Sequence, residues 1–218
     1  MMGRIALNLA VAALPAAAFV LWARRKTTIP TSGYYRAFLY GLLAVFPALL
    51  VMLPVSARLA GIAGLGGDAL RAFIVAGLIE ETVKAFPARL SSRQSVWNRE
   101  DRAAVAATTG IGFAFMENAF YLVGSSSLLI ARGILAVPLH AATAVYLGLA
   151  GRETAAGGRA LRDVPAAILL ATVVHGGYDL AAKRLPAVAP LVVAAAVLLA
   201  ARFAVAHPRH GGDRSGNR

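Results

Sequence analysis

The sequence contains no cysteine among its 218 residues, and it has only 10 acidic residues against 22 basic ones. The absence of cysteine excludes disulfide bonds, thiolate catalysis and zinc sites built from cysteine. Glycine-rich phosphate loops, Walker motifs and dinucleotide fingerprints are also missing, so we expect no soluble cofactor. No polar stretch is long enough to form an independent soluble domain.

Apolar residues dominate what is present: 59% of the chain is hydrophobic, and the mean hydropathy is +0.68. A soluble domain of this size does not need so much apolar surface, so we predict an all-α polytopic membrane protein. The basic residues lie mostly in short gaps between apolar runs, which is typical of topology signals. No basic face interleaved with aromatic residues lies outside these runs, so we expect no nucleic-acid partner.

Seven apolar runs are long enough to cross a bilayer as helices, since a span needs about 20 residues. They cover approximately residues 5–23, 37–55, 70–88, 103–123, 128–150, 164–182 and 188–206. The sequence thus predicts a single transmembrane domain over residues 1–206 and a disordered polar tail over residues 207–218. Residues 61–67 are expected to form a flexible loop, and residues 125–127 a tight turn.

Basic residues are distributed unequally between the two sets of alternate gaps, 14 against 6. The positive-inside rule then places the amino terminus outside and the carboxyl terminus inside, which requires an odd number of spans. The first run is followed by Arg24, Arg25 and Lys26 and preceded only by Arg4. This charge order favours a retained first helix over a cleaved signal peptide.

Two adjacent glutamates, Glu80 and Glu81, lie within the third run, and Lys84 follows them. A carboxylate at mid-bilayer costs about 2.5–3.5 kcal/mol on insertion scales, so such residues are usually buried against protein or water and are often functional. On a helix, Glu80 and Lys84 share one face and Glu81 lies beside it. Glu80 and Lys84 taken alone are equally well explained as a structural ion pair.

Further polar residues lie in the next three runs. In the fourth run, a stripe at four-residue steps consists of Phe113, Glu117 and Tyr121. The fifth run contains Arg132 and His140. In the sixth run, His175 and Asp179 share a helix face, next to Gly176 and Gly177. Each residue alone is compatible with helix packing or with hydrogen bonds between helices. Together they supply the groups needed for acid–base chemistry or metal binding, so we predict one polar chamber shared by four helices.

These residues resemble the four motifs of PrsW-type intramembrane proteases, in order and in helix placement. The motifs are Glu80-Glu81-x-x-Lys84, Phe113-x-x-x-Glu117-x-x-x-Tyr121, Arg132 with His140 and Gly148, and His175-x-x-x-Asp179. The resemblance covers residues 70–182, which we take as the catalytic core. The related CAAX-processing endopeptidases usually carry Arg at the position of Lys84 and Asn at the position of Asp179, so the PrsW branch is the closer match.

The resemblance implies an endopeptidase of the bacterial cytoplasmic membrane that cuts a membrane-anchored protein such as an anti-sigma factor. It also implies that Glu80 and Glu81 are essential and that Glu117, His140 and His175 complete the site. Lys84, Arg132, Tyr121 and Asp179 are then supporting residues.

Two versions of the chemistry remain open at this stage. In one, His140, His175 and Glu117 bind zinc and another glutamate is the base. In the other, which the lack of a His-Glu-x-x-His motif slightly favours, no metal is bound, a glutamate is the base and the histidines orient water or hold the oxyanion. In either version we expect only one of Glu80 and Glu81 to be ionised, because two adjacent carboxylates in a low dielectric repel each other.

Two other functions also fit an intramembrane set of acids and histidines. A proton- or ion-coupled transporter uses such chains as relays, although seven spans without an inverted repeat fit that function poorly. A non-catalytic scaffold would keep the same residues for helix association.

Overall fold

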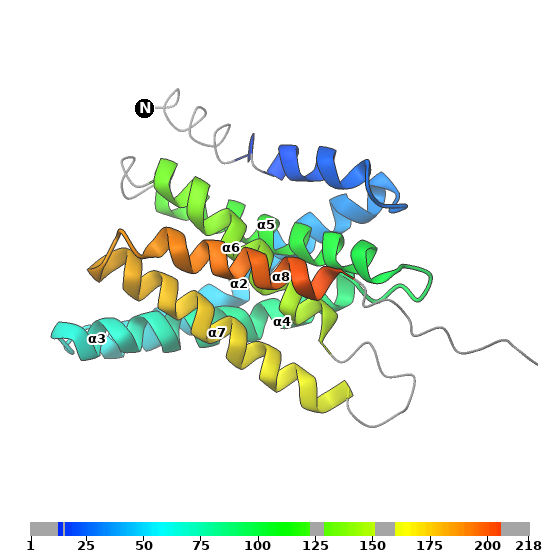
Figure 1. Cartoon of the computed structure of the whole chain (residues 1–218). Coiled ribbons are helices and arrows are strands. Elements are labelled where there is room, and N and C mark those ends of the chain that lie inside the picture. Colours follow the sequence, from blue (N-terminus) through cyan, green and yellow to red (C-terminus); the bar gives the residue numbers. More distant parts are fainter. Residues whose placement is uncertain (1–12, 15, 123–128, 151–159, 206–218) are drawn as a thin grey trace, which may run out of the picture.

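The computed structural model describes residues 13–14, 16–122, 129–150 and 160–205, and all regular structure in this part of the chain is helical (Figure 1). The elements are α2 (Thr31–Leu59), α3 (Gly64–Leu70), the π-helix η1 (Arg71–Ile79), α4 (Glu80–Ser91), α5 (Arg99–Leu122), α6 (Leu129–Leu149), α7 (Ala160–Arg184) and α8 (Ala189–Ala204). Residues 13–14 and 16–24 are also helical. The all-α prediction is therefore confirmed. The predicted turn at 125–127 and the tail at 207–218 lie outside the described residues.

The segment before Glu80 differs from the prediction in two respects. The expected loop over residues 61–67 is shorter, because α3 already begins at Gly64, whose φ of +74° suits glycine. The run 70–88 is not one α-helix: η1 carries the chain from Arg71 to Ile79, and the α-helical pattern begins at Glu80. π-helices are rare, and those that do occur are often found at functional sites. The apolar pattern alone does not distinguish the two hydrogen-bonding patterns.

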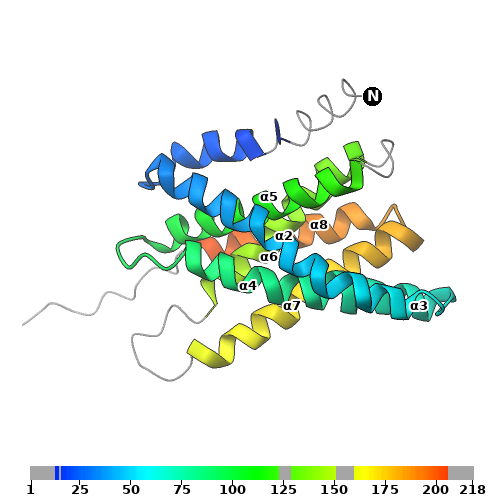
Figure 2. The ribbon, with the colours of Figure 1, turned by 180° about the vertical axis from the view of Figure 1, so that it is seen from behind.

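The described helices pack around α5 and α6, with α2 against α5, α7 against η1 and α8 against α6 (Figures 1 and 2). Two glycines permit close contacts beside the polar residues of the bundle. A Cβ at Gly110 would lie 2.0 Å from the carbonyl oxygen of His140, and one at Gly176 would lie 2.5 Å from Phe73. A neighbouring helix therefore approaches closely at Gly176, whereas a Cβ at Gly177 would meet open space.

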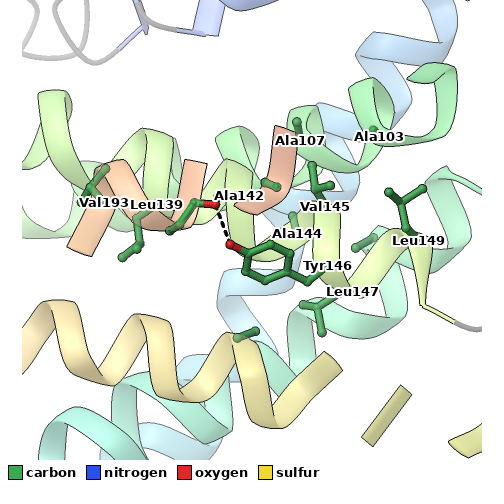
Figure 3. Packing of buried hydrophobic residues seen from close by; sticks show 14 of the residues in the cluster. Ala103, Ala107, Leu139, Ala142, Ala144, Val145, Tyr146, Leu147, Leu149 and Val193 are labelled. Carbon is green, nitrogen blue, oxygen red and sulfur yellow. Dashed lines mark hydrogen bonds between the residues drawn. The ribbon is translucent and has the colours of Figure 1, made fainter. Parts of the chain in front are cut away.

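The largest apolar cluster surrounds Tyr146 of α6, between α5 and α8 (Figure 3). Alanine and other small side chains let the helices approach closely here. The Tyr146 hydroxyl donates a hydrogen bond of 2.5 Å to the carbonyl oxygen of Ala196, which joins α6 to α8. Burial of the ring therefore leaves no unsatisfied hydroxyl.

The surface of α2 is apolar, whereas charged side chains lie in the interior of the bundle. The exposed stripe on α2 consists of Tyr35, Leu39, Leu43, Phe46, Leu50 and Leu53. A stripe of this size on a soluble protein would mark a binding surface or an aggregation hazard. On a helix that faces lipid such a stripe is expected, because the lipid tails are as apolar as these side chains.

Two of the described helices are long and apolar enough to cross a membrane, Thr31–Leu59 and Asp163–Arg184. Ile134–Leu149 and Ala189–Ala204 are shorter apolar helices. The seven spans that the sequence predicts are therefore not confirmed by the described helices. The π-helix divides the third predicted run. That run is also the least apolar of the seven, because it contains Glu80, Glu81 and Lys84.

Asp68 ties the start of the α3–η1 segment to the end of α7. Its Oδ1 accepts hydrogen bonds from Lys183 Nζ at 2.7 Å and Arg71 Nη2 at 2.8 Å, and its Oδ2 accepts one from Arg184 Nε at 2.6 Å. Lys183 above all, then Arg71 and Arg184, holds the pKa of Asp68 below its usual range. These ion pairs connect the segment that leads to Glu80 with the helix that carries His175.

The start of α5 is fixed by a reciprocal cap. The backbone N–H of Asp101 donates to Asn98 Oδ1 at 2.8 Å, and the backbone N–H of Asn98 donates to Asp101 Oδ2 at 3.3 Å. The Asp101 carboxylate also accepts hydrogen bonds from the backbone N–H and hydroxyl of Thr28. The cap therefore also holds the connection that leads into α2.

Candidate active site

The two adjacent glutamates lie at the first turn of α4, and both are buried. The Glu81 Oε1 atom contacts three side chains from three helices. Lys84 Nζ lies 2.6 Å away, His175 Nδ1 lies 2.7 Å away and Thr143 Oγ1 lies 3.3 Å away. Glu81 is therefore the point at which α4, α6 and α7 are joined by polar contacts.

Lys84 pairs with Glu81 and not with Glu80, which corrects the pairing considered from the sequence. Residues three apart on a helix are as close as residues four apart, so both pairings were open. The second contact of Lys84 decides between them, because its Nζ also lies 2.8 Å from His140 Nδ1. The ammonium lies 4.6 Å from the centre of the Phe113 ring, within the range of a cation–π contact.

His140 of α6 has a partner at each ring nitrogen. Its Nδ1 faces Lys84, and its Nε2 lies 2.9 Å from Glu117 Oε2. A lysine ammonium has donors only, so Nδ1 accepts and Nε2 carries the proton that faces Glu117. The imidazole is further enclosed by the rings of Phe113 and His175, with centroids 5.5 Å and 4.8 Å away.

His175 of α7 is oriented by a carboxylate at its Nδ1, namely Glu81. Its Nε2 lies 4.0 Å from Glu80 Oε2 and 3.7 Å from Asp179 Oδ2. A histidine that donates from Nδ1 to a carboxylate keeps its Nε2 lone pair available, an arrangement that also orients metal-binding histidines. The predicted His175–Asp179 face therefore points towards the glutamates.

The Oε2 atoms of Glu80 and Glu81 are both buried, and neither makes a hydrogen bond within the described part of the chain. Leaving a buried acceptor unsatisfied costs about 1–3 kcal/mol, or more for a charged group. Glu80 also lines a cavity of about 180 Å³, together with Glu117 and apolar side chains of α2 and α5. A carboxylate without a hydrogen bond at one oxygen, on a side chain that lines a cavity, can accept a proton or bind a ligand there.

The structure thus brings together Glu80, Glu81, Lys84, Glu117, His140, His175 and Asp179. The side chains of Tyr121 and Arg132, two supporting residues in the sequence prediction, lie outside the described part of the structure. Sequence reasoning missed Thr143 and the wall that α2 contributes to the cavity. Thr143 lies three residues after His140, a helical spacing that could have indicated it, whereas α2 is too uniformly apolar to signal any role.

Three side chains of the site could together hold a metal ion. Glu80, His140 and His175 each offer one ligand atom, and these atoms lie within 4.8 Å of one another. The residue types suit zinc, which takes three protein ligands in catalytic sites. Glu80 Oε2 and His175 Nε2 are available for such a role, whereas the hydrogen bonds of His140 compete with it. The sequence-based metal set contained Glu117 in place of Glu80; in the structure Glu117 contacts His140.

Comparison with known proteins gives one family match and two relatives. The sequence profile of the family described as "PrsW family intramembrane metalloprotease" matches residues 29–205. "Protease PrsW" of Geobacillus kaustophilus (strain HTA426) is 32% identical over 154 residues, which cover 69% of this chain and 67% of that protein. "Protease PrsW" of Bacillus subtilis (strain 168) is 26% identical over 155 residues, which cover 69% of each. No solved structure matches the chain.

Proposed function

The chain belongs to the PrsW family of intramembrane metalloproteases, and on this premise we propose that Glu80, Glu117, His140 and His175 surround the peptide bond that it hydrolyses. The observation that carries the proposal is the unsatisfied oxygen of Glu80, which is buried beside two histidines on a side chain that lines a cavity. Peptide hydrolysis needs a base for water, a donor for the leaving amine and groups that stabilise the oxyanion. These four residues supply all three.

The hydrogen bonds of His140 favour a division of labour that needs no metal ligand. Glu80 Oε2 takes a proton from water as that water attacks the scissile carbonyl. His175 Nε2, 4.0 Å from Glu80 Oε2, accepts that proton on its lone pair and passes it to the leaving amine. His140 Nε2–H, which faces Glu117, turns towards the developing oxyanion. Glu81 and Lys84 orient the two imidazoles and do not touch the substrate.

A second form of the chemistry is favoured by the family description and by the closeness of three donors. In that form Glu80, His140 and His175 would hold zinc, which supplies a Lewis acid for the carbonyl and activates water. Glu117, at the cavity, would then be the base. Metal analysis of purified, active protein separates the forms. One equivalent of zinc, removed by a chelator together with activity and restored with it, would refute the metal-free form.

The substrate and the topology are also part of the proposal. We propose an integral protein of the bacterial membrane with seven spans, an outer amino terminus and a catalytic core at residues 70–182. Its substrate would be a single-span regulator such as an anti-sigma factor. The absence of cysteine makes the topology directly testable. Gln94→Cys should be protected from a membrane-impermeant maleimide in intact cells, and Gly66→Cys should react; the opposite result would reverse the orientation.

Cleavage itself is tested in bacterial membranes with single-span reporters that carry a randomised segment and a releasable tag. We expect the wild type and Glu100→Gln, a change at an exposed carboxylate, to release the same tags. Glu80→Gln, inserted to the same level, should release none of them. Equal release by Glu80→Gln would remove the catalytic role assigned to this carboxylate. Glu80-dependent proton flux without release would instead indicate a transporter.

A further inference from the structure

We infer that the cavity beside Glu80 is a subsite that takes one apolar side chain of the substrate, adjacent to the scissile bond. This inference rests on the proposed function and extends it to the choice of substrate. Six of the side chains that line the cavity are apolar: Val45, Ala48, Leu49, Met52, Phe113 and Phe120. The two acidic side chains that also line it, Glu80 and Glu117, are those placed at the reaction centre.

The size of the cavity matches one side chain. Its volume is about 180 Å³, and an engineered cavity of about 150 Å³ in another protein holds benzene. Leucine, methionine and phenylalanine side chains therefore fit, whereas an alanine would leave most of the space unfilled. An acidic side chain would meet two carboxylates and an apolar wall, and its burial would go uncompensated.

The position of the cavity connects it to the chemistry. Since Glu80 forms part of the wall, a side chain held in the cavity places the adjoining peptide bond at that carboxylate. Phe120 also lines the cavity and is 43% exposed, so the cavity lies next to the surface of the bundle. Phe46 of α2 packs edge-on against Phe120, with ring centroids 6.1 Å apart. The rim thus lies between α2 and α5, next to the apolar stripe of α2, so the substrate reaches the cavity from the lipid side.

Ala48 is the residue that sets the depth of the subsite. It is fully buried and lies on α2, one turn from Val45 and from Met52. Because Ala48 lines the cavity, a larger side chain at this position would take up part of its volume. Met52 also lines the cavity and is half-buried, so truncating it would widen the subsite.

The experiment uses a reporter that the wild type cleaves at a position located by mass spectrometry. The residues on either side of that bond are changed in turn to Ala, Leu, Phe, Asp and Lys. For one of the two sides we expect Leu to be cleaved about 10–100-fold faster than Ala, the range that one apolar pocket supplies, and Asp and Lys to be cleaved more slowly still.

Two variants then change the pocket in opposite directions. Ala48→Leu should lower cleavage of the Leu reporter at least about tenfold and leave that of the Ala reporter nearly unchanged. Met52→Ala should raise the rate for Phe relative to Leu. Val51→Phe adds volume on the exposed face of α2 and should change neither preference.

The outcomes distinguish a failure of the proposed subsite from a failure of the proposed function. Glu80-dependent cleavage that prefers Lys or Asp, or whose preference is the same in Ala48→Leu and Met52→Ala as in the wild type, would overturn the subsite and leave the proposed function intact. A wild type without any Glu80-dependent cleavage would overturn both. If Ala48→Leu fails to insert, Met52→Ala decides alone.

Discussion

Neutralising Glu81 is the perturbation whose consequences the structure defines most sharply. Glu81 and Lys84 are both fully buried, and their charged atoms are 2.6 Å apart. Glu81→Gln keeps the shape of the side chain but leaves the ammonium of Lys84 without its charged partner. Breaking a buried ion pair from one side costs about 3–5 kcal/mol, because the remaining charge is uncompensated.

Removing both charges should cost much less than the sum of the single changes. In Glu81→Gln/Lys84→Met no charge of the pair remains, and replacing a buried ion pair by neutral groups of similar volume is often neutral or stabilising. We therefore expect Lys84→Met to cost about 3–5 kcal/mol alone and the double variant less than about 2 kcal/mol. Activity should not return with stability, since the double variant still lacks the carboxylate that orients His175.

The free energy of unfolding is measured by denaturant titration in mixed micelles, and cleavage of a membrane reporter is measured in parallel. Glu100→Gln and Lys26→Met, which change exposed charges, are the matched controls and should each stay within about 0.5 kcal/mol of the wild type. A loss below about 1 kcal/mol for Glu81→Gln, or additive losses in the double variant, would refute the assignment of this pair as a buried, coupled unit.

Three further changes, one with a matched control, test the contacts that hold the helices around the site. Because the pKa of Asp68 is held below its usual range in the folded state, Asp68→Asn should lower the melting temperature at pH 7; the difference from the wild type should shrink as the pH falls below about 4, where an unfolded aspartate is protonated. Asn98→Ala removes a helix cap and should cost about 1 kcal/mol of unfolding free energy, with activity unchanged. Gly110→Ala would press against the carbonyl of His140 and should cost about 1–3 kcal/mol and most of the activity, whereas Gly177→Ala, which meets open space, should be harmless by both measures.

The sequence predicted the helices and the polar residues of the site because both leave strong local signals. Long apolar runs predict spanning helices, and ionisable residues within them are too costly to be accidental. The sequence analysis placed Glu117, His140 and His175 in one polar chamber, and these side chains lie close together in the structure. Their catalytic roles stay predictions.

The contacts between the helices could not be predicted in the same way. Whether Lys84 pairs with Glu80 or Glu81 depends on where His140 lies, and that is a property of the packed bundle. The same holds for Glu80, whose unsatisfied oxygen is visible only once its neighbours are placed. The π-helix before Glu80 and the wall supplied by Val45 and Ala48 leave no pattern that differs from an ordinary apolar helix.

The most direct test of the account is the single-turnover cleavage rate of purified protein, reconstituted in liposomes with a reporter that the wild type cuts. Glu80→Gln should lower that rate about 10²–10⁴-fold, the contribution expected of a positioned acid or base, while its melting temperature stays close to that of the wild type. A normally folded Glu80→Gln protein that cuts the reporter at the wild-type rate would contradict the assignment of the reaction to this cluster of carboxylates and histidines.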